Sequence, residues 1–313
     1  MKIGVMGAGA LGGLFGGRLA ADGHEVWMIA RGAHLAAMQA NGLRILSPKG
    51  DAHLPDIRAT GDPAEVGVCD VVMFMVKNGD VETAAQAIRP MVGPETMVVT
   101  CQNGISAWER LGAVIGAGHV VPGVARTPGE IAEPGVIRHT AMLDRLIFGE
   151  PGGGGSARCD RLAQAMAASG TTPIVSPNIM HELWSKFVGQ STLASITALT
   201  RLDIGPLREN PVSRKLFYDA TAEAYAVGRA AVPDLPEDTV AHNWAFVEQL
   251  PYEMHASMLD DLRRGKPLEH EYLSGDVVRL GERFGVPTPI HSVFYAALKP
   301  VADRLAEGIS APV

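Results

Sequence analysis

Residues 1–13 read MKIGVMGAGALGG, and this opening decides how the first half of the chain folds. The apolar run Lys2–Met6 predicts a strand, and a helix is predicted from about Ala10 to Asp22. A G-x-G-x-x-G turn joins them and consists of Gly7, Ala8, Gly9, Ala10, Leu11 and Gly12. The first glycine permits the tight turn, the second permits the close approach of a pyrophosphate, and the third permits close helix–strand packing. The helix N-terminus also offers N–H groups to phosphates. We predict a dinucleotide-binding turn, with a purely structural Gly-Ala turn as the alternative.

The rest of the first half alternates strand and helix. Glu25–Ala30 predicts a second strand, and the apolar, β-branched runs Asp70–Val76 and Thr96–Cys101 are typical of parallel strands buried on both faces. Helices are predicted near residues 81–91 and 107–115, so the expected fold is α/β with a Rossmann-type doubly wound sheet. Gly135–Thr140 and Arg145–Gly149 are interpreted as a hairpin added to that sheet.

The character of the sequence changes after Pro177, because no convincing strand follows it. Asn178 is a plausible N-cap for a helix that runs to about Leu202. Further amphipathic helices are predicted at 211–231, 239–263, 268–284 and 290–307. We therefore predict two domains: residues 1–176, which bind the cofactor, and residues 177–313, an all-helical C-terminal domain that carries substrate and catalytic residues.

Composition narrows the class of protein. The chain has 313 residues and a net charge of −7, and an acidic chain is a poor partner for nucleic acid. No apolar run reaches the roughly 18 residues that span a bilayer, and the N-terminus does not resemble a signal peptide. Three widely spaced cysteines are expected to be buried free thiols, so we expect a cytoplasmic protein. The sequence leaves the oligomeric state open, a homodimer included.

Arg31 stands at the end of the second predicted strand, where an NAD site usually has an acidic residue for the ribose 2′-hydroxyl. Its guanidinium suits a 2′-phosphate, which favours NADP over NAD, although a solvated surface arginine is the alternative. Lys77 and Gln102-Asn103-Gly104 follow two buried strands. Because open α/β sheets bind ligands at the carboxyl ends of their strands, we expect these groups to face one crevice. A loop lysine and a turn-forming Asn-Gly are the alternatives.

Lys186 lies early in the long helix that begins the second domain. At 100° per residue, Gln190, Ala194 and Thr197 fall on the same stripe. Helical spacing alone leaves a solvated lysine as the commoner interpretation. No H-E-x-x-H motif, clustered Cys/His spacing or G-x-S-x-G elbow is present, which disfavours metal catalysis and a serine hydrolase.

Taken together, these residues resemble the ketopantoate reductase family (2-dehydropantoate 2-reductase). The similar segments are the glycine turn with Arg31, Val76-Lys77, 101–104, 134–139, 182–186, 256–261, 265–269 and 285–289. The glycine turn alone is shared with many dehydrogenases. The combination of Q-N-G, the tryptophan–lysine helix, S-M-L-x-D and the glutamate after G-x-P is specific to this family.

The resemblance implies reduction of the C2 ketone of a small anionic 2-oxo acid with NADPH, as in pantothenate biosynthesis. It implies that Lys186 is the general acid and that Glu269 lies near it, contacting substrate or cofactor. Ser257 then resembles the residue that binds the substrate carboxylate, and Asn103 the residue that bridges cofactor and substrate. Lys77 would add positive charge for both anions.

The chain departs from the family at two positions. Where the family usually has asparagines four and eight residues after the lysine, this chain has Gln190 and Ala194. Alanine offers no hydrogen bond, so a 2-oxo acid with a less polar tail stays open beside ketopantoate. A catalytically silent NADP-binding sensor and a 3-hydroxyacid dehydrogenase are further alternatives. Lys186 with Glu269 disfavours the first, and the S-M-L-x-D and G-x-P-x-E segments disfavour the second.

Overall fold

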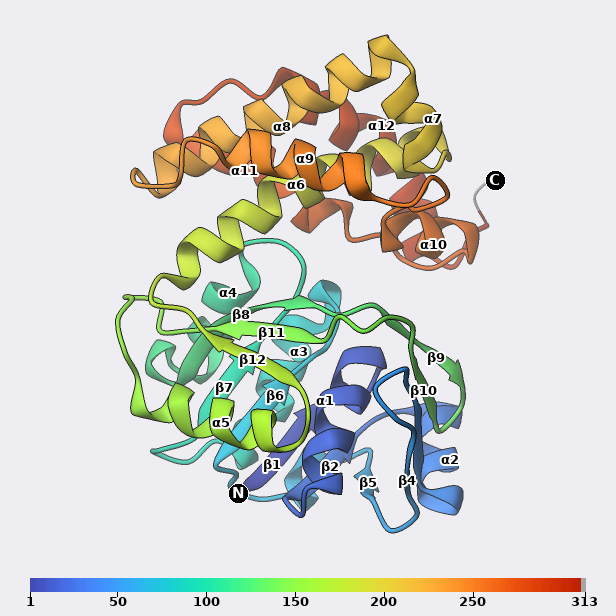
Figure 1. Cartoon of the computed structure of the whole chain (residues 1–313), viewed down its shortest axis with the longest axis vertical. Coiled ribbons are helices and arrows are strands. Elements are labelled where there is room, and N and C mark those ends of the chain that lie inside the picture. The colour runs from blue at the N-terminus through green and yellow to red at the C-terminus, as the bar shows by residue number, and fades with distance from the viewer. Residues whose placement is uncertain (311–313) are drawn as a thin grey trace. The chain divides into compact units, whose positions relative to one another are not determined.

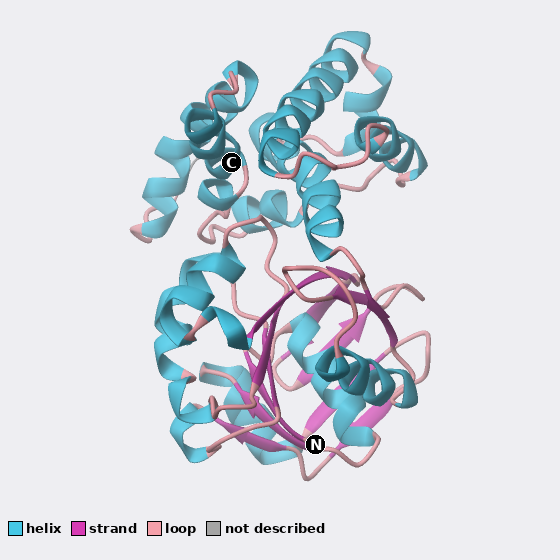
Figure 2. Ribbon diagram, turned by 90° about the vertical axis from the view of Figure 1, so that its left-hand side faces the viewer, coloured by secondary structure: helices cyan, strands magenta, loops and turns pink. Residues whose placement is uncertain are grey.

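The computed structural model describes residues 1–310, and the chain divides into two compact units. The first unit contains Met1–Gln102 and Ala107–Ile179, and the second contains Asn103–Ser106 and the chain from Met180 onward (Figure 1). All of the strands belong to the first unit, whereas the described residues from 180 to 310 form only helices and loops (Figure 2). The predicted fold class, a doubly wound α/β sheet followed by a helical part, is confirmed.

The main sheet of the first unit has eight strands in the order β12-β11-β8-β7-β6-β1-β2-β5. Its neighbours are parallel except for β8 and β11, which run antiparallel. The strands are β1 (Lys2–Met6), β2 (Glu25–Ile29), β5 (Arg58–Thr60), β6 (Val71–Phe74), β7 (Met97–Thr100), β8 (Val120–Arg126), β11 (Arg145–Phe148) and β12 (Thr172–Val175).

Helices cover both faces of this sheet, because successive side chains of a strand point to opposite sides. Along β6, Val71 and Met73 join one apolar cluster, whereas Val72 and Phe74 join the other. The first cluster includes residues of α1 and α5, and the second includes residues of α3 and α4. The helices of this unit are α1 (Ala10–Ala21), α2 (Gly32–Asn41), α3 (Val81–Ala87), α4 (Ala107–Ile115) and α5 (Ala157–Ala168). The continuous apolar runs in the sequence are explained by this double burial.

The predicted hairpin of Gly135–Thr140 with Arg145–Gly149 is wrong. The first segment forms β10 (Val136–His139), which pairs with β9 (Gly129–Glu133) and β3 (Leu43–Leu46) in a second sheet of order β4-β3-β10-β9. The second segment is β11 of the main sheet. The true hairpin is β9–β10, which turns at Pro134 and at Gly135 with φ +80°. Since β9 alternates exposed and half-buried residues, it lacked the apolar run that identified other strands.

The second unit is built from α6 (Ile179–Thr200), α7 (Ile204–Glu209), α8 (Pro211–Ala231), α9 (Thr239–Gln249), α10 (Ser257–Arg263), α11 (Ser274–Phe284) and α12 (Pro289–Ala306). The single helix predicted for 239–263 is wrong, because the chain breaks at Leu250–Pro251 between α9 and α10. Pro251 cannot continue a helical hydrogen-bond ladder. The helix predicted from Leu268 begins only at Ser274, after a 3₁₀ turn at His270–Tyr272.

The remaining short elements are β4 (Ala52–Leu54) and the 3₁₀ turns Pro63–Glu65, Asn78–Asp80, Arg89–Met91 and Ala117–His119. Cys69, Cys101 and Cys159 are free and buried, as predicted, and burial raises the pKa of the Cys69 thiol to about 11. Within residues 1–310, none of the helices combines the length and apolarity that a membrane crossing requires.

Candidate functional site

The glycine turn after β1 has the geometry that a phosphate-binding turn needs. Gly7 has φ +94°, and a Cβ there would lie 2.9 Å from the backbone carbon of Met75. A Cβ on Gly12 would overlap the carbonyl oxygen of Gly7. At Gly9, by contrast, a Cβ would meet no atom within 4 Å. Gly7 and Gly12 therefore serve packing, whereas the space beside Gly9 is left for a ligand to approach the backbone.

Backbone hydrogen bonds hold this turn in place. The N–H groups of Gly7 and Ala8 donate to the carbonyl oxygen of Ile29, at 3.2 and 3.0 Å. The first bond of α1 runs from Gly13 N–H to Gly9 at 2.7 Å. Donors in the first turn of a helix have no intrahelical partner, so those of 10–12 are directed out of the helix end. The turn thus fits the pyrophosphate of a dinucleotide.

Arg31 and the segment after Lys77 meet at the same edge of the sheet. Arg31 directly precedes α2, and its side chain is 83% exposed. It forms an ion pair with Asp80 at 3.0 Å, and Asp80 lies in the 3₁₀ turn that follows Lys77. Lys77 itself is exposed at the end of the β6 segment. The predicted cofactor residues of the first unit therefore gather at the carboxyl ends of β1, β2 and β6. No sequence pattern identified Asp80, because its partner Arg31 lies 49 residues away.

Gln102, the first residue of the Q-N-G segment, joins the ends of two strands. Its amide nitrogen donates to the carbonyl oxygens of Phe74 and Val76, at 2.9 and 3.0 Å. Its amide oxygen accepts a hydrogen bond from Thr100. Gln102 thereby binds the end of β6 to the end of β7 and holds the backbone that leads into Lys77.

The next residues of that segment belong to the second unit, where Asn103 meets Lys186. The Lys186 ammonium donates to Asn103 Oδ1 at 3.0 Å, although the two residues are 83 positions apart. Gly104 has φ +95°, and a Cβ there would lie 2.5 Å from the carbonyl oxygen of Tyr272. Ser106 donates to Asp276 at 2.8 Å, and Asp276 is also paired with Arg279 at 2.7 Å. These contacts explain why the segment packs with helices of the second unit.

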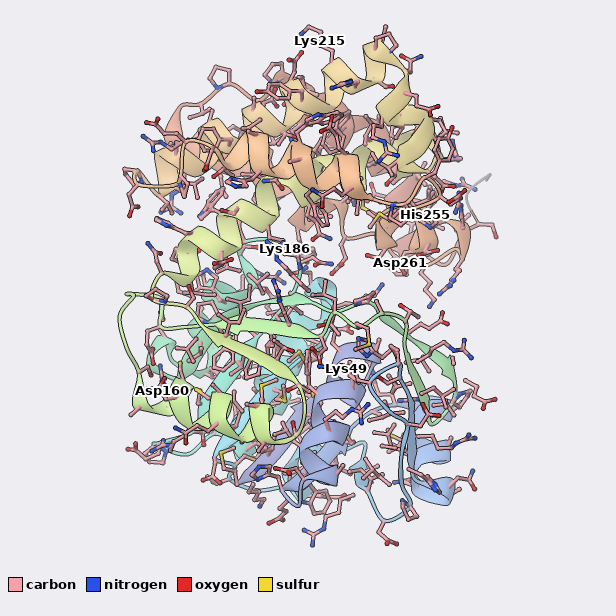
Figure 3. All side chains as sticks on the ribbon, in the orientation of Figure 1. Lys49, Asp160, Lys186, Lys215, His255 and Asp261 are labelled. Carbon is pink, nitrogen blue, oxygen red and sulfur yellow. The ribbon has the colours of Figure 1, made fainter. Side chains whose placement is uncertain are left out.

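Lys186 lies in the first half of α6 (Figure 3). Its side chain is partly buried, and residues 191–198 further along the helix are buried. Gln190, one turn later, is also partly buried, whereas Ala194 is 1% exposed. Thr197 is fully buried, and its hydroxyl donates to the carbonyl oxygen of Leu193 at 2.7 Å. Along the helical stripe predicted from the sequence, the side chains therefore become more deeply buried from Lys186 to Thr197.

Ser257 and Glu269 lie on two other elements of the same unit. Ser257 is exposed and is the first residue of α10. His255 holds this end of the helix by contacts with Asp203 at 2.8 Å and Asp260 at 3.2 Å. Glu269 is partly buried and directly precedes the 3₁₀ turn at His270–Tyr272, the turn that packs against Gly104.

Comparison with protein families identifies the group of proteins to which these features belong. Residues 3–153 match the model "Ketopantoate reductase PanE/ApbA", and residues 178–302 match its C-terminal counterpart. The chain belongs to the ketopantoate reductase family. It is therefore an oxidoreductase that acts on a CH–OH group with a pyridine nucleotide, and this family reduces small 2-oxo acids.

Individual relatives agree with this family assignment. A 2-dehydropantoate 2-reductase of Mesorhizobium japonicum is 33% identical over 96% of this chain and 98% of its own length. The crystal structure of a PanE/ApbA family ketopantoate reductase from Ralstonia eutropha JMP134 has a TM-score of 0.90 at 32% identity, covering 98% of this chain and 100% of that one. A D-mandelate dehydrogenase solved with NADH and anilino(oxo)acetate has a TM-score of 0.87 over 98% of this chain and 99% of its own. At 22% identity, that last match shows a shared fold.

Proposed function

We propose that this chain is an NADPH-dependent 2-oxo acid reductase whose best substrate is 2-dehydropantoate, which it converts to pantoate. The observation that carries the proposal is the contact between Lys186 and Asn103 Oδ1 at 3.0 Å. A lysine on a helix is commonly a solvated charge. Here a side chain from a distant loop accepts a hydrogen bond from the ammonium and gives it a defined orientation.

Lys186 is the proton donor in this proposal. Reduction of a ketone places negative charge on the carbonyl oxygen, and a nearby ammonium stabilises that charge and then supplies the proton. Asn103 orients the ammonium through its Oδ1. Glu269 contributes a carboxylate on the substrate or cofactor side, and the exposed hydroxyl of Ser257 binds the substrate carboxylate.

The cofactor residues in the proposal are the glycine turn, Arg31, Lys77, Asn103 and Glu269. NADPH supplies the hydride for the C2 carbon of the substrate. The open space beside Gly9 and the donors of the first turn of α1 suit its pyrophosphate. The exposed guanidinium of Arg31 suits the 2′-phosphate that distinguishes NADPH from NADH.

A panel of 2-oxo acids with NADPH, followed by the loss of NADPH absorbance, tests the reaction. We expect turnover of ketopantoate or of a branched 2-oxo acid of similar size. Turnover of 3-oxo acids alone would contradict the proposed substrate class. NADPH binding without turnover of any acid would favour the catalytically silent sensor.

Gln190 and Ala194 favour a second candidate, a reductase for a 2-oxo acid with a less polar tail. A substrate hydroxyl buried without a partner costs roughly 1–3 kcal/mol. That cost corresponds to about 5- to 150-fold in kcat/KM. If these two positions line the substrate site, ketopantoate is used less efficiently than 2-oxoisovalerate.

Variants of these two positions separate the candidates. Gln190→Asn with Ala194→Asn should shift the ratio of kcat/KM values toward ketopantoate. Because Ala194 is 1% exposed, a larger residue there displaces a neighbour, so Gln190→Asn alone and a thermal melt of each variant are the controls. A wide preference for ketopantoate in the unmodified protein would rule out the less polar candidate and leave the first one.

A further inference from the structure

The imidazole of His34 joins the glycine turn to the β9–β10 hairpin. His34 lies in the first turn of α2, three residues after Arg31. Its Nε2 is 2.9 Å from the carbonyl oxygen of Ala8, and its Nδ1 is 3.0 Å from the backbone nitrogen of Gly135. No motif in the sequence pointed to this residue, because its partners are 26 and 101 positions away.

The two contacts together determine the state of the ring. A backbone N–H can only donate, so Nδ1 must offer its lone pair to Gly135. A carbonyl oxygen can only accept, so Nε2 must carry the proton that it donates to Ala8. Only the neutral imidazole protonated on Nε2 satisfies both contacts. An imidazolium has two N–H donors and would face the Gly135 N–H with a donor of its own.

His34 also completes the anchoring of Ala8. The N–H of Ala8 donates to Ile29, and its carbonyl oxygen accepts from His34, so both backbone polar groups of this residue are engaged. The hairpin lies close to the same place, because a Cβ on Gly129 would lie 3.9 Å from the Cβ of Ala10. One side chain therefore connects three elements around the turn: the start of α1, the start of α2 and the hairpin.

We propose that His34 is a positioning residue for the cofactor turn, and that its neutral ring holds the Ala8 peptide in the conformation that binds the dinucleotide. This inference rests on the proposed function in taking NADPH as the ligand. It extends that function by making cofactor affinity depend on the protonation of one histidine. Protonation breaks the contact with Gly135 and loosens the turn before the cofactor binds.

The surroundings of His34 favour the neutral ring. Partial burial lowers the pKa of His34, although the hydrogen bond to Ala8 opposes the shift. The charged side chains on the elements packed around it are engaged elsewhere or exposed. They are Arg31 (paired with Asp80), Arg58 (paired with Glu25), Glu130 (paired with Arg138), Arg18 (donating to the Gly50 carbonyl) and the exposed Glu133.

Equilibrium binding of NADPH, measured by quenching of tryptophan fluorescence, tests the proposal without turnover. His34→Ala should raise the Kd for NADPH by about three- to tenfold, the loss expected for one or two hydrogen bonds. His34→Gln keeps a donor that can reach Ala8 and should recover most of the affinity. His34→Asn is too short to reach Ala8 and should bind as weakly as the alanine variant. His53→Ala removes an exposed imidazole from β4 of the same small sheet and should leave the Kd unchanged.

The pH profile separates positioning from a merely structural contribution. As the pH falls from 7.5 to 5.5, wild-type affinity should weaken relative to that of His34→Gln, whose amide does not titrate. Protonation of the 2′-phosphate affects both proteins equally and cancels in the ratio of their Kd values.

Two results would overturn the role of His34: an unchanged Kd in folded His34→Ala protein, or a Kd ratio that stays flat with pH. Binding of NADPH by the wild-type protein tests the cofactor proposal separately. If the wild type binds NADH instead, the NADPH assignment fails while the same variants, measured with NADH, still test His34.

Discussion

Lys186 carries the proton chemistry proposed for this chain, and Asn103 already orients its side chain at 3.0 Å. Two residues that closely follow Asn103 hold its segment in place. Gly104 lies against the Tyr272 carbonyl, and Ser106 donates to Asp276. Lys186, which was predicted from the family resemblance, is thus held by neighbours that local sequence patterns did not reveal.

Replacing Lys186 with alanine tests its role directly. If the ammonium is the proton donor, Lys186→Ala should lower kcat by at least about 100-fold, with little change in NADPH affinity. Lys215→Ala is the matched control, because Lys215 is an exposed lysine on α8 that pairs only with Asp219 among the described residues. If the Lys186 variant keeps most of its kcat, Lys186 is a solvated lysine and not the proton donor.

Arg31 should determine which dinucleotide is used. Its exposed guanidinium stands where NAD sites place an acid, so we expect kcat/KM with NADPH to exceed that with NADH by more than about tenfold. Arg31→Asp should narrow or invert the ratio. Equal use of both cofactors by the unmodified protein would contradict the assignment.

Asp80 should weaken the preference for NADPH over NADH that Arg31 confers. Its carboxylate pairs with Arg31 at 3.0 Å and would compete with a 2′-phosphate for that guanidinium. Exposed ion pairs are weak, so Asp80→Asn should tighten NADPH binding by only about two- to fivefold. NADH, which lacks the phosphate, serves as the control ligand. An equal gain for NADH would show that Asp80 acts on the turn in general.

At the scale of elements, α6 is a core helix that carries Lys186, the proposed proton donor, in its partly buried first half. Residues 191–198 are buried, and the hydroxyls of Ser191, Thr192, Ser195 and Thr197 donate to carbonyl oxygens one turn earlier in the helix. This arrangement lets a polar sequence occupy the centre of the unit.

The contact between α6 and α9 depends on a glycine. Asn243 of α9 donates to the carbonyl oxygens of Ser185 and Thr239, both at 2.9 Å, and a Cβ on Gly189 would overlap its side-chain oxygen. Gly189→Ala should therefore lower the free energy of unfolding by about 1–3 kcal/mol. Adding Asn243→Ala removes the overlap, so the double variant should be more stable than the sum of the single changes predicts. Chemical denaturation measures the coupling between the two positions. If the two changes in unfolding free energy simply add, the overlap between residue 189 and Asn243 is relieved by a small shift of the helices.

At the scale of the whole molecule, a buried hydrogen-bond chain links four helices of the second unit. His291 of α12 is fully buried; its Nε2 lies 3.1 Å from the Ala220 carbonyl of α8, and its Nδ1 lies 3.3 Å from the Ser274 hydroxyl of α11. Ser274 in turn contacts Ser195 of α6. Since the Ala220 oxygen only accepts, Nε2 carries a proton. Burial, which lowers the pKa of His291, favours the neutral ring.

This histidine makes stability depend on pH. Burial lowers the pKa of His291 from 6.5 to about 4. Between these values the unfolded chain binds a proton that the folded chain does not, so the free energy of unfolding falls as the pH drops from 6.5 to about 4. The full effect is on the order of 3 kcal/mol. Denaturation of wild type and His291→Gln across this range isolates the contribution, because other groups cancel in the difference. Parallel pH profiles would contradict it.

Local patterns in the sequence determined the parts of this protein that depend on neighbouring residues. The glycine turn, four strands of the doubly wound sheet (β1, β2, β6 and β7) and the bounds of α8 follow from turn chemistry, apolar runs and helical periodicity, and the structure has them where they were predicted. Family resemblance added Lys186, and its contact with Asn103 is consistent with the proposed role.

Tertiary structure alone decided the pairings between distant segments. The partner of β10, the contact of Arg31 with Asp80 and the bridge from His34 to Gly135 join residues that local propensity treats independently. Propensity reports how one segment prefers to fold, whereas these pairings depend on which apolar faces are buried together. For the same reason, Asn103–Ser106 interrupts the first unit in sequence yet packs with the helices of the second.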